Sequence, residues 1–129
     1  DLVNAIRGVL GPRSGAPEFA RLFQAVRIAV NDEIGRLTDA LEGFLAVLAP
    51  GGVLAVVAYH SGEDRVVKHT LREWARDCVC PSEQPVCTCR GHALGEVLTR
   101  RAVRPGPAEV ASNPRARSAR LRAFRKAAA

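Results

Sequence analysis

The sequence predicts an α/β fold, and three stretches carry that prediction. Residues 18–48 repeat apolar side chains at every third or fourth position, which is the spacing of a helix with one buried face. The apolar run VLAVVAY follows at residues 53–59 without alternation, as buried central strands of parallel sheets do. A second helical pattern then begins at Ser61. The order helix, turn, strand, helix is typical of parallel α/β proteins.

The N-terminal elements are separated by glycine and proline. Residues 1–10 predict a short amphipathic helix, and GPRSGAP at residues 11–17 breaks it. Pro17 suits the first turn of the long helix, whereas Gly35 and Gly43 weaken its interior and predict a bend. The sequence APGG at residues 49–52 ends that helix, because proline cannot continue it and glycine accepts the dihedral angles of a tight turn.

The C-terminal half predicts one more helix and two more strands. Ser61 is the expected helix cap, and Glu63 and Asp64 lie in the first turn, where acids interact favourably with the helix dipole. Residues 96–103 and 118–124 are the strand candidates, the second as an edge strand, with a loop and a turn of helix at residues 105–111. Because so few strands make a poor sheet alone, we expect further strands upstream.

Composition indicates one globular domain with a basic surface that suits an anionic partner. The chain has 129 residues, of which 47% are hydrophobic and 25% charged, which is enough for a buried core. The net charge of +6 favours nucleic acid or another anionic partner. No apolar run of about 20 residues and no signal peptide are visible, so we expect no membrane association. Since the sequence contains no methionine, we expect it to be a piece of a longer chain, with a processed chain as the alternative.

The stretch NPRARSARLR, residues 113–122, contains four arginines and no acid. In an alternating strand, Arg115 and Arg117 would share one face, and Arg120 and Arg122 the other. Both faces cannot be buried, so if one pair packs on carboxylates, the other is free to meet phosphates. A solvated surface strand is the alternative. We predict an RNA-backbone contact, supported by further arginines on the neighbouring strand candidate: Arg100, Arg101 and Arg104.

Four cysteines form two C-x-C pairs separated by six residues: Cys78, Cys80, Cys87 and Cys89. Four thiolates in a short loop can close a tetrahedral zinc site, which would be structural because no coordination position stays open. The C-x-C spacing is tighter than the C-x-x-C of most zinc ribbons. Free thiols and two disulfides therefore remain alternatives, the disulfides being disfavoured in a reducing cytosol. His92 is a less favoured substitute ligand.

Three segments together resemble the C-terminal half of the RsmH (MraW) family. They are FQAVRIAVNDEI at residues 23–34, LAPGGVLAVVAYHSGEDRVVK at residues 48–68, and NPRARSARLR, and they occur in the family's order across nearly the whole chain. That family methylates the N4 amine of a cytidine in small-subunit (16S) ribosomal RNA, using S-adenosylmethionine. Where the family usually reads SFHSLEDR, this chain has AYHSGEDR. Gly62 should loosen the start of the following helix, but no titratable group is lost.

The resemblance implies the C-terminal half of a class I (Rossmann-like) methyltransferase sheet with flanking helices. Residues 53–59 would be its fifth strand, and the last two strands its closing pair. Residues 1–16 would end an inserted helical region, and residues 17–129 would be the C-terminal part of the methyltransferase domain, with a cysteine loop at 78–92 and a basic tail at 113–126. The family's glycine-rich cofactor loop has no counterpart here, since Gly51 and Gly52 precede a strand. We therefore expect an upstream part to bind S-adenosylmethionine and this chain alone to be inactive.

Polar side chains in two helices are the other candidate RNA contacts. Gln24, Arg27 and Asn31 share one helix face, where an amide can read a base edge and a guanidinium can hold a phosphate; a solvated helix side is the alternative. The motif YHSGEDR follows a strand at the edge where α/β sheets bind ligands. His60 and Ser61 are expected to orient the target base or its ribose, unless they only cap the helix and fill the turn. Asp64 is expected to pair with Arg65 or Lys68. The full RNA-binding set predicted is Gln24, Arg27, Asn31, His60, Ser61, Asp64, Arg65, Lys68, Asn113, Arg115, Arg117, Ser118, Arg120 and Arg122.

The resemblance therefore implies methylation of a flipped or unpaired cytidine in small-subunit ribosomal RNA or its assembling particle, in the cytoplasm. A homodimer is compatible with the sequence. The alternative is a non-catalytic RNA-binding module stapled by zinc, which needs only the basic tail and the cysteines. A DNA cytosine-N4 or adenine methyltransferase is a third, weaker alternative.

Overall fold

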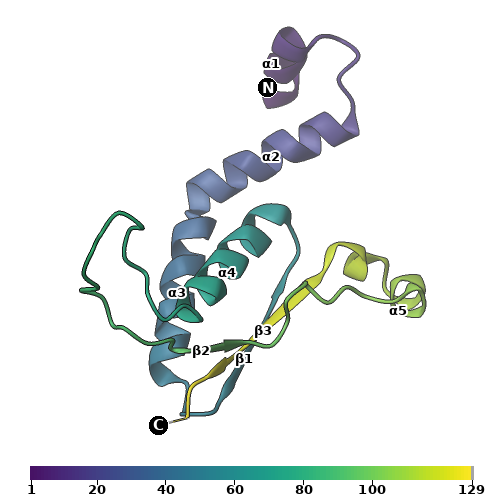
Figure 1. Ribbon diagram of the computed structural model, residues 1–129. Helices are drawn as coiled ribbons and strands as arrows, with labels where there is room; N and C mark the ends of the chain where they lie inside the picture. Colours follow the sequence, from purple (N-terminus) through teal and green to yellow (C-terminus); the bar gives the residue numbers. More distant parts are fainter. Residues whose placement is uncertain (129) are drawn as a thin grey trace. The chain divides into compact units, whose positions relative to one another are not determined.

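A computed structural model describes residues 1–128 and shows an α/β fold (Figure 1). Its contacts define two compact units, Asp1–Arg36 and a second unit that begins at Leu37. No helix in the described part of the chain combines the length and apolar character that a membrane span needs. In chain order the elements are α1 (Leu2–Leu10), α2 (Ala16–Asn31), α3 (Glu33–Val47), β1 (Val53–Ala58), α4 (Ser61–Trp74), β2 (Gly95–Val97), α5 (Pro107–Ser112), the 3₁₀-helix η1 (Pro114–Ser118) and β3 (Arg120–Lys126).

The first unit begins with the predicted short helix. The Asp1 carboxylate caps α1 by accepting a hydrogen bond from the Asn4 N–H at 2.9 Å. Pro17 lies in the first turn of α2, as expected, and the Glu18 carboxylate accepts from the Gly15 N–H at 2.9 Å. The two helices are linked by the Arg7 guanidinium, which lies 5.6 Å from the centre of the Phe19 ring.

The prediction of one long helix over residues 18–48 is wrong in one respect, because the helix is interrupted at Asp32. Asp32 has left-handed dihedral angles, φ 48° and ψ 45°, so that α2 ends at Asn31 and α3 begins at Glu33. Aspartate tolerates this conformation better than most residues other than glycine. The break therefore precedes both glycines predicted to bend the helix. Gly35 instead makes room for the Asp32 carboxylate, with which a Cβ atom at position 35 would collide.

The second unit contains a three-stranded sheet in the order β1–β3–β2. Every strand pair in the described residues is antiparallel, with Val56 opposite Arg122 and Val97 opposite Phe124. The two C-terminal strands thus pair with each other, but the parallel pairing expected from the local pattern is not found among residues 1–128. The expected edge strand at 118–124 is in fact the middle strand. The strand expected at 96–103 is shorter, and only an isolated bridge between Val103 and Leu121 continues it.

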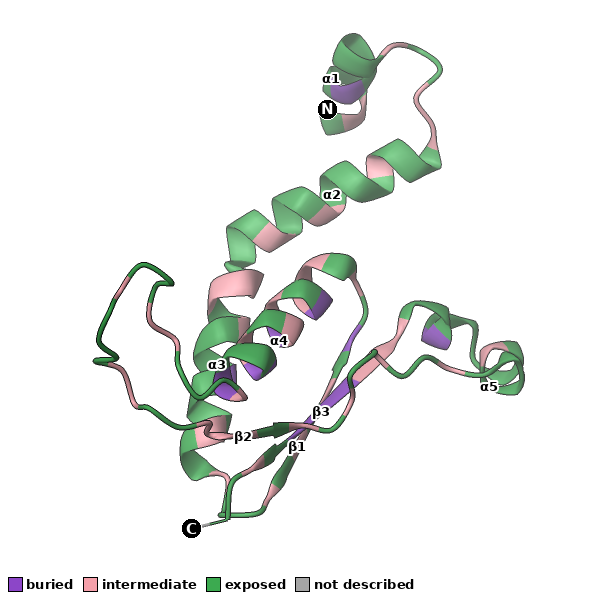
Figure 2. Ribbon diagram, in the orientation of Figure 1, coloured by how far each residue is buried: buried purple, intermediate pink, exposed green. Residues whose placement is uncertain are grey.

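The core lies between one face of this sheet and the helices α3 and α4. It is built from five buried side chains, namely Leu41, Val67, Leu71, Trp74 and Phe124. Figure 2 shows buried positions on α3, along α4 and in the middle of β3. The Trp74 and Phe124 rings meet edge to face, with centroids 5.4 Å apart. The unit therefore has two layers, helices on sheet.

The face of β1 that points away from the helices is apolar and exposed in the described structure. Val53 and Val57 of β1 are 49% and 47% exposed, whereas Leu54, Val56 and Ala58 point toward the helices. This alternation differs from the strand buried on both faces that the sequence predicted. The unbroken apolar run suits a strand covered on both sides, but the described residues cover only one.

Candidate nucleic-acid interface

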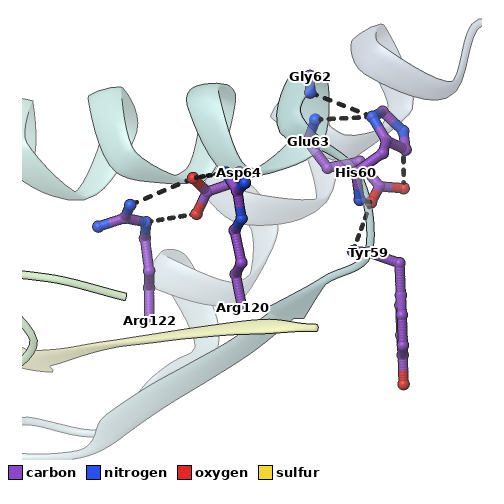
Figure 3. Close-up of polar contacts among 7 residues, drawn as sticks. All are labelled: Tyr59, His60, Gly62, Glu63, Asp64, Arg120 and Arg122. Carbon is purple, nitrogen blue, oxygen red and sulfur yellow. Dashed lines mark hydrogen bonds and ion pairs between the residues drawn. The ribbon is translucent and has the colours of Figure 1, made fainter. Parts of the chain in front are cut away.

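The turn between β1 and α4 is fixed by His60 and Glu63, which bind each other's backbone (Figure 3). His60 Nδ1 accepts hydrogen bonds from the N–H groups of Gly62 and Glu63, at 3.1 and 3.3 Å. Glu63 Oε2 accepts from the N–H groups of Tyr59 and His60, at 3.0 and 3.3 Å. The expectation that Ser61 caps the helix is therefore wrong. His60 is the cap, because its ring nitrogen reaches the same amides that a serine hydroxyl would, and Ser61 is the first helical residue.

The two accepted hydrogen bonds also define the tautomer of His60. Nδ1 must carry a lone pair, so the proton of the neutral ring lies on Nε2. Nε2 is buried and lies 3.2 Å from Glu63 Oε1, within ion-pair distance but not aligned for a hydrogen bond. The imidazole is thus held in one orientation at the end of β1.

His60→Ala should lower the free energy of unfolding by about 1 kcal/mol, the usual effect of losing a side-chain helix cap. Ser61→Ala is the matched control and should change stability little, because alanine is favoured in a helix and Ser61 provides no cap. Urea unfolding followed by Trp74 fluorescence measures both variants. Equal losses in the two variants would contradict the assignment of the cap to His60.

Asp64 lies in the first turn of α4 and is buried against β3. The Arg122 guanidinium donates two hydrogen bonds to the Asp64 carboxylate, from Nε to Oδ1 at 2.7 Å and from Nη2 to Oδ2 at 3.3 Å (Figure 3). Arg120 adds a bond from Nη1 to Oδ2 at 3.1 Å. The predicted pairing of Asp64 with Arg65 or Lys68 is therefore wrong. Residues two apart on a strand share a face, so β3 aims both arginines at the helix above it.

These arginines control the charge of the carboxyl group. The hydrogen bonds from Arg122 lower the pKa of Asp64 from its ordinary value, and those from Arg120 add to the effect, although burial opposes it. Asp64 is thus an anion that holds two cations in place.

The other two arginines of the basic stretch do not lie in a strand. Pro114–Ser118 forms η1, so the alternating faces predicted for Arg115 and Arg117 are wrong. Asn113 caps this short helix, because its side-chain oxygen accepts a hydrogen bond from the Arg115 N–H at 3.2 Å, and Pro114 lies in the first turn. The segment therefore forms a helix and not the predicted strand. Both arginines are exposed, and neither has an ion-pair partner within residues 1–128. One arginine pair therefore does pack on a carboxylate, whereas the other has no ion-pair partner among residues 1–128, the condition under which the sequence left it free for phosphates.

A basic cavity of about 520 Å³ lies beside the Asp64 cluster, near the carboxyl end of β1. Seven of its nine lining residues are cations, and one is an acid. We call this set the basic basin: Asp64, Lys68, Arg72, Arg100, Arg101, Ala102, Arg104, Arg120 and Arg122.

Two segments far apart in sequence supply the basin's unpaired cations. Lys68 and Arg72 lie one turn apart on α4, while the other three follow β2 in an irregular segment rather than in the predicted strand. None of the five (Lys68, Arg72, Arg100, Arg101 and Arg104) has a hydrogen-bond or ion-pair partner within residues 1–128. Like charges this close repel one another, so the arrangement favours a bound polyanion. Sequence reasoning missed Arg72, which the four-residue spacing from Asp64 through Lys68 could have indicated.

The predicted face of α2 belongs to the first unit. Gln24 is half-buried and Asn31 is exposed at the end of the helix. Arg27 is not the free guanidinium that the sequence predicted, because its Nε and Nη2 donate to the two carboxylate oxygens of Glu33 at 2.8 and 3.1 Å. A phosphate would have to compete with Glu33 for this arginine.

The four cysteines come together in the loop between α4 and β2. All four Sγ atoms lie within 4.8 Å of one another. The hydrogen bond with Cys89 raises the pKa of Cys87 to about 12, whereas the N–H groups of Val79 and Gly91 lower the pKa of Cys89 to about 6. His92 is not in this group, and its Nδ1 lies 2.7 Å from the Arg90 carbonyl oxygen instead.

Fold and site together define a class: a helices-on-sheet α/β protein with a strongly electropositive cavity at the carboxyl end of a strand. Within that class, the chain belongs to the MraW methylase family, whose model matches residues 1–127. The resemblance found in the sequence is therefore confirmed.

The curated relatives are named as ribosomal RNA small subunit methyltransferase H. The protein of Gemmatimonas aurantiaca is 62% identical over 127 residues, covering 98% of this chain and 40% of that relative. The protein of Symbiobacterium thermophilum is 51% identical over 126 residues, with 98% and 40% covered. That of Geobacter sulfurreducens is 50% identical over 129 residues, with 97% and 41% covered. The chain thus spans about 40% of the length of these relatives.

Proposed function

We propose that this chain is the RNA-gripping part of an S-adenosylmethionine-dependent methyltransferase that modifies the N4 amine of a cytidine in small-subunit ribosomal RNA, in the cytoplasm. The match of residues 1–127 to the MraW methylase family carries the proposal, and the relatives' names supply the RNA class. The match does not favour the alternative of a non-catalytic zinc-stapled module.

The basic basin is the proposed site of phosphate binding. Asp64 holds Arg120 and Arg122 in fixed positions, so part of the basin's floor is preorganised. The five cations around it that have no partner among the described residues can make charge-assisted hydrogen bonds to phosphate oxygens. The exposed Arg115 and Arg117 of η1 would extend the contact along the RNA backbone. Such contacts position RNA without reading its sequence.

The capped turn beside the basin is the proposed place for the target base. His60 is held rigidly in one tautomer, and Tyr59 is 58% exposed next to it. An exposed aromatic ring at this edge can stack on a base that has left its helix. Ser61, Arg65, Asn113 and Ser118 remain proposed contacts of the same RNA, as do Gln24 and Asn31 in the first unit.

The described residues do not fit the methyl donor. Gly51 and Gly52 precede β1, whereas a cofactor loop follows a strand. The basin is lined by cations, which would repel the positively charged sulfonium of S-adenosylmethionine. We propose that the donor binds to the part of the relatives that this chain does not cover. That part would supply parallel strands along β1 and cover Val53 and Val57, completing a class I methyltransferase sheet.

A chimera tests this proposal directly. This chain is fused behind the remaining portion of the Gemmatimonas aurantiaca relative, replacing the segment to which it is 62% identical. Incubated with S-adenosylmethionine and small ribosomal subunits that lack the modification, the chimera should form N4-methylcytidine, detected by mass spectrometry of RNA nucleosides. The isolated chain should form none.

Binding without methyl transfer separates the alternatives. A chimera that binds ribosomal RNA as tightly as the intact relative, but transfers no methyl group, would favour the binding module. Preferential methylation of DNA, in competition with RNA at equal salt, would favour a DNA methyltransferase instead.

A further inference from the structure

We propose that Cys78, Cys80, Cys87 and Cys89 bind one structural zinc ion. The four residues form two C-x-C pairs in the loop between α4 and β2. This inference is independent of the proposed function, because it rests on the loop's own geometry.

The sulfur atoms have the spacing of a tetrahedral tetrathiolate site. With zinc–sulfur bonds of about 2.3 Å, the sulfurs of such a site lie about 3.8 Å apart. Here Cys87 lies 3.7 Å from Cys78, 3.9 Å from Cys80 and 3.4 Å from Cys89, and Cys89 lies 3.8 Å from Cys78. The remaining pairs are within 4.8 Å. All four ligands are thus already gathered around one centre.

Backbone N–H groups point at these sulfurs. The Val79 N–H donates to Cys89 Sγ at 3.4 Å, the Gly91 N–H is directed at the same atom, and Cys80 receives N–H groups from Thr88 and Cys89. Such donors stabilise thiolates, the form in which cysteine binds a metal. Four thiolates packed this closely would repel one another strongly, and a divalent cation at their centre removes that repulsion.

The loop itself needs a stabilising element. Residues 75–94 form only turns and bends, and loops longer than about 12–15 residues without regular structure are uncommon unless they have a function. The base of the loop is fixed, because the Leu94 N–H donates to the Trp74 carbonyl at 2.7 Å and Arg90 Nη2 donates to the Glu73 carbonyl at 2.6 Å. Its outer part, from Cys78 to Cys89, buries no side chain fully. A zinc ion would replace the missing core.

Two other states of the cysteines are less compatible with the structure. A disulfide needs sulfurs about 2.05 Å apart, whereas these Sγ atoms lie 3.4–3.9 Å apart in the four pairs given above, and all four cysteines are free. Iron also accepts four thiolates. Cys78 and Cys87 are exposed, however, and a redox-inert zinc ion suits a solvent-facing site better than an oxidisable iron.

The test is metal analysis of the whole chain purified under reducing conditions. We expect about one zinc per chain, as one closed tetrathiolate site requires. Replacement by Co²⁺ should give the visible absorption and thiolate charge-transfer bands of tetrahedral cobalt. Cys87→Ser should lose most of the zinc and the cobalt spectrum. Ser82→Ala in the same loop is the matched control and should retain both.

Several outcomes would overturn the proposal. These are a chain that contains less than about a tenth of an equivalent of metal, stoichiometric iron in place of zinc, or an intact mass that shows two disulfides, each in the chain as purified under reducing conditions. If Cys87→Ser fails to fold, Cys78→Ser and the chelator-treated wild-type chain provide the same comparison. Trp74 fluorescence reports in each case whether the core beside the loop is intact. Removal of the metal should lower the midpoint of thermal unfolding in the wild-type chain and leave it unchanged in the cysteine variants.

Discussion

Asp64→Asn is expected to lower the free energy of unfolding by about 3–5 kcal/mol, the range for breaking a buried ion pair from one side. The Asp64 and Arg122 side chains are only 9% and 10% exposed, so Arg122 would remain buried without a counter-ion. Arg120, with 33% of its side chain exposed, would be pushed toward solvent by its neighbour. Chemical unfolding followed by Trp74 fluorescence measures the loss.

Glu96→Gln is the matched control for this variant. Glu96 also accepts a hydrogen bond from an arginine of β3, Arg125, at 2.9 Å, but the two side chains are 62% and 50% exposed. An exposed pair of this kind contributes only about 0–1 kcal/mol, because water and salt screen it. Similar losses in the two variants would show that burial is not what makes the Asp64 cluster important.

The ion pair between Asp64 and Arg122 also predicts that the stability of the chain depends on pH. The folded-state pKa of Asp64 is lowered, so its contribution is fully present above its ordinary pKa of 3.8 and disappears as the pH falls through the lowered value. The stability difference between the wild-type chain and Asp64→Asn should therefore be constant near neutral pH and shrink below about pH 4. A difference that grows on acidification would contradict this sign.

Replacing Arg100, Arg101 and Arg104 together by alanine should weaken binding to small-subunit ribosomal RNA by about 100-fold at 0.1 M salt. Each arginine that neutralises a phosphate releases condensed counter-ions, so the slope of log affinity against log salt should become shallower by about 2–3 units. All three side chains line the basic basin and lack partners within the described structure, so their loss should leave folding intact. Fluorescence anisotropy across a salt series measures both quantities.

The control for the basin variant must remove the same net charge elsewhere. Arg13, Arg21 and Arg36 lie in the first unit, outside the basin. Their replacement by alanine changes the total charge equally, and it should alter the salt slope by less than about one unit. If both triple variants lose affinity equally, RNA responds to overall charge and the basin is not a specific site.

Local patterns predicted several elements correctly because short-range physics decides them. The helix at residues 1–10, the turn at APGG, β1 and the apolar side of α4 all follow from periodicity, proline and glycine. Local rules also placed an acid-rich helix start after β1. The prediction of Ser61 as the cap was wrong, however, because the preferences for helix N-termini favour serine over histidine. In the structure, His60 Nδ1 accepts the hydrogen bonds from the Gly62 and Glu63 N–H groups that a serine cap would accept.

The partners of the charged residues could not be read from spacing. Asp64 and Arg122 are 58 residues apart, and their pairing depends on α4 packing across the middle strand. The local candidates Arg65 and Lys68 lie on the helix near Asp64, but β3 presents two guanidinium groups directly beneath the carboxylate. Likewise, the break in the long helix lies at Asp32, whose carboxylate packs against Gly35. Helix propensities of single residues do not include such a contact between two side-chain positions.

By itself, the sequence determined the α/β class, the basic character of the C-terminal stretch and the family, since each depends on composition, periodicity or motif order along the chain. Only the tertiary structure decided which arginines are neutralised, where the free ones gather, and that four cysteines share one centre. The physical reason is the range of the forces involved. Backbone preferences act over a few residues, whereas charge pairing and metal-ligand geometry depend on distances that exist only after helices and strands have packed.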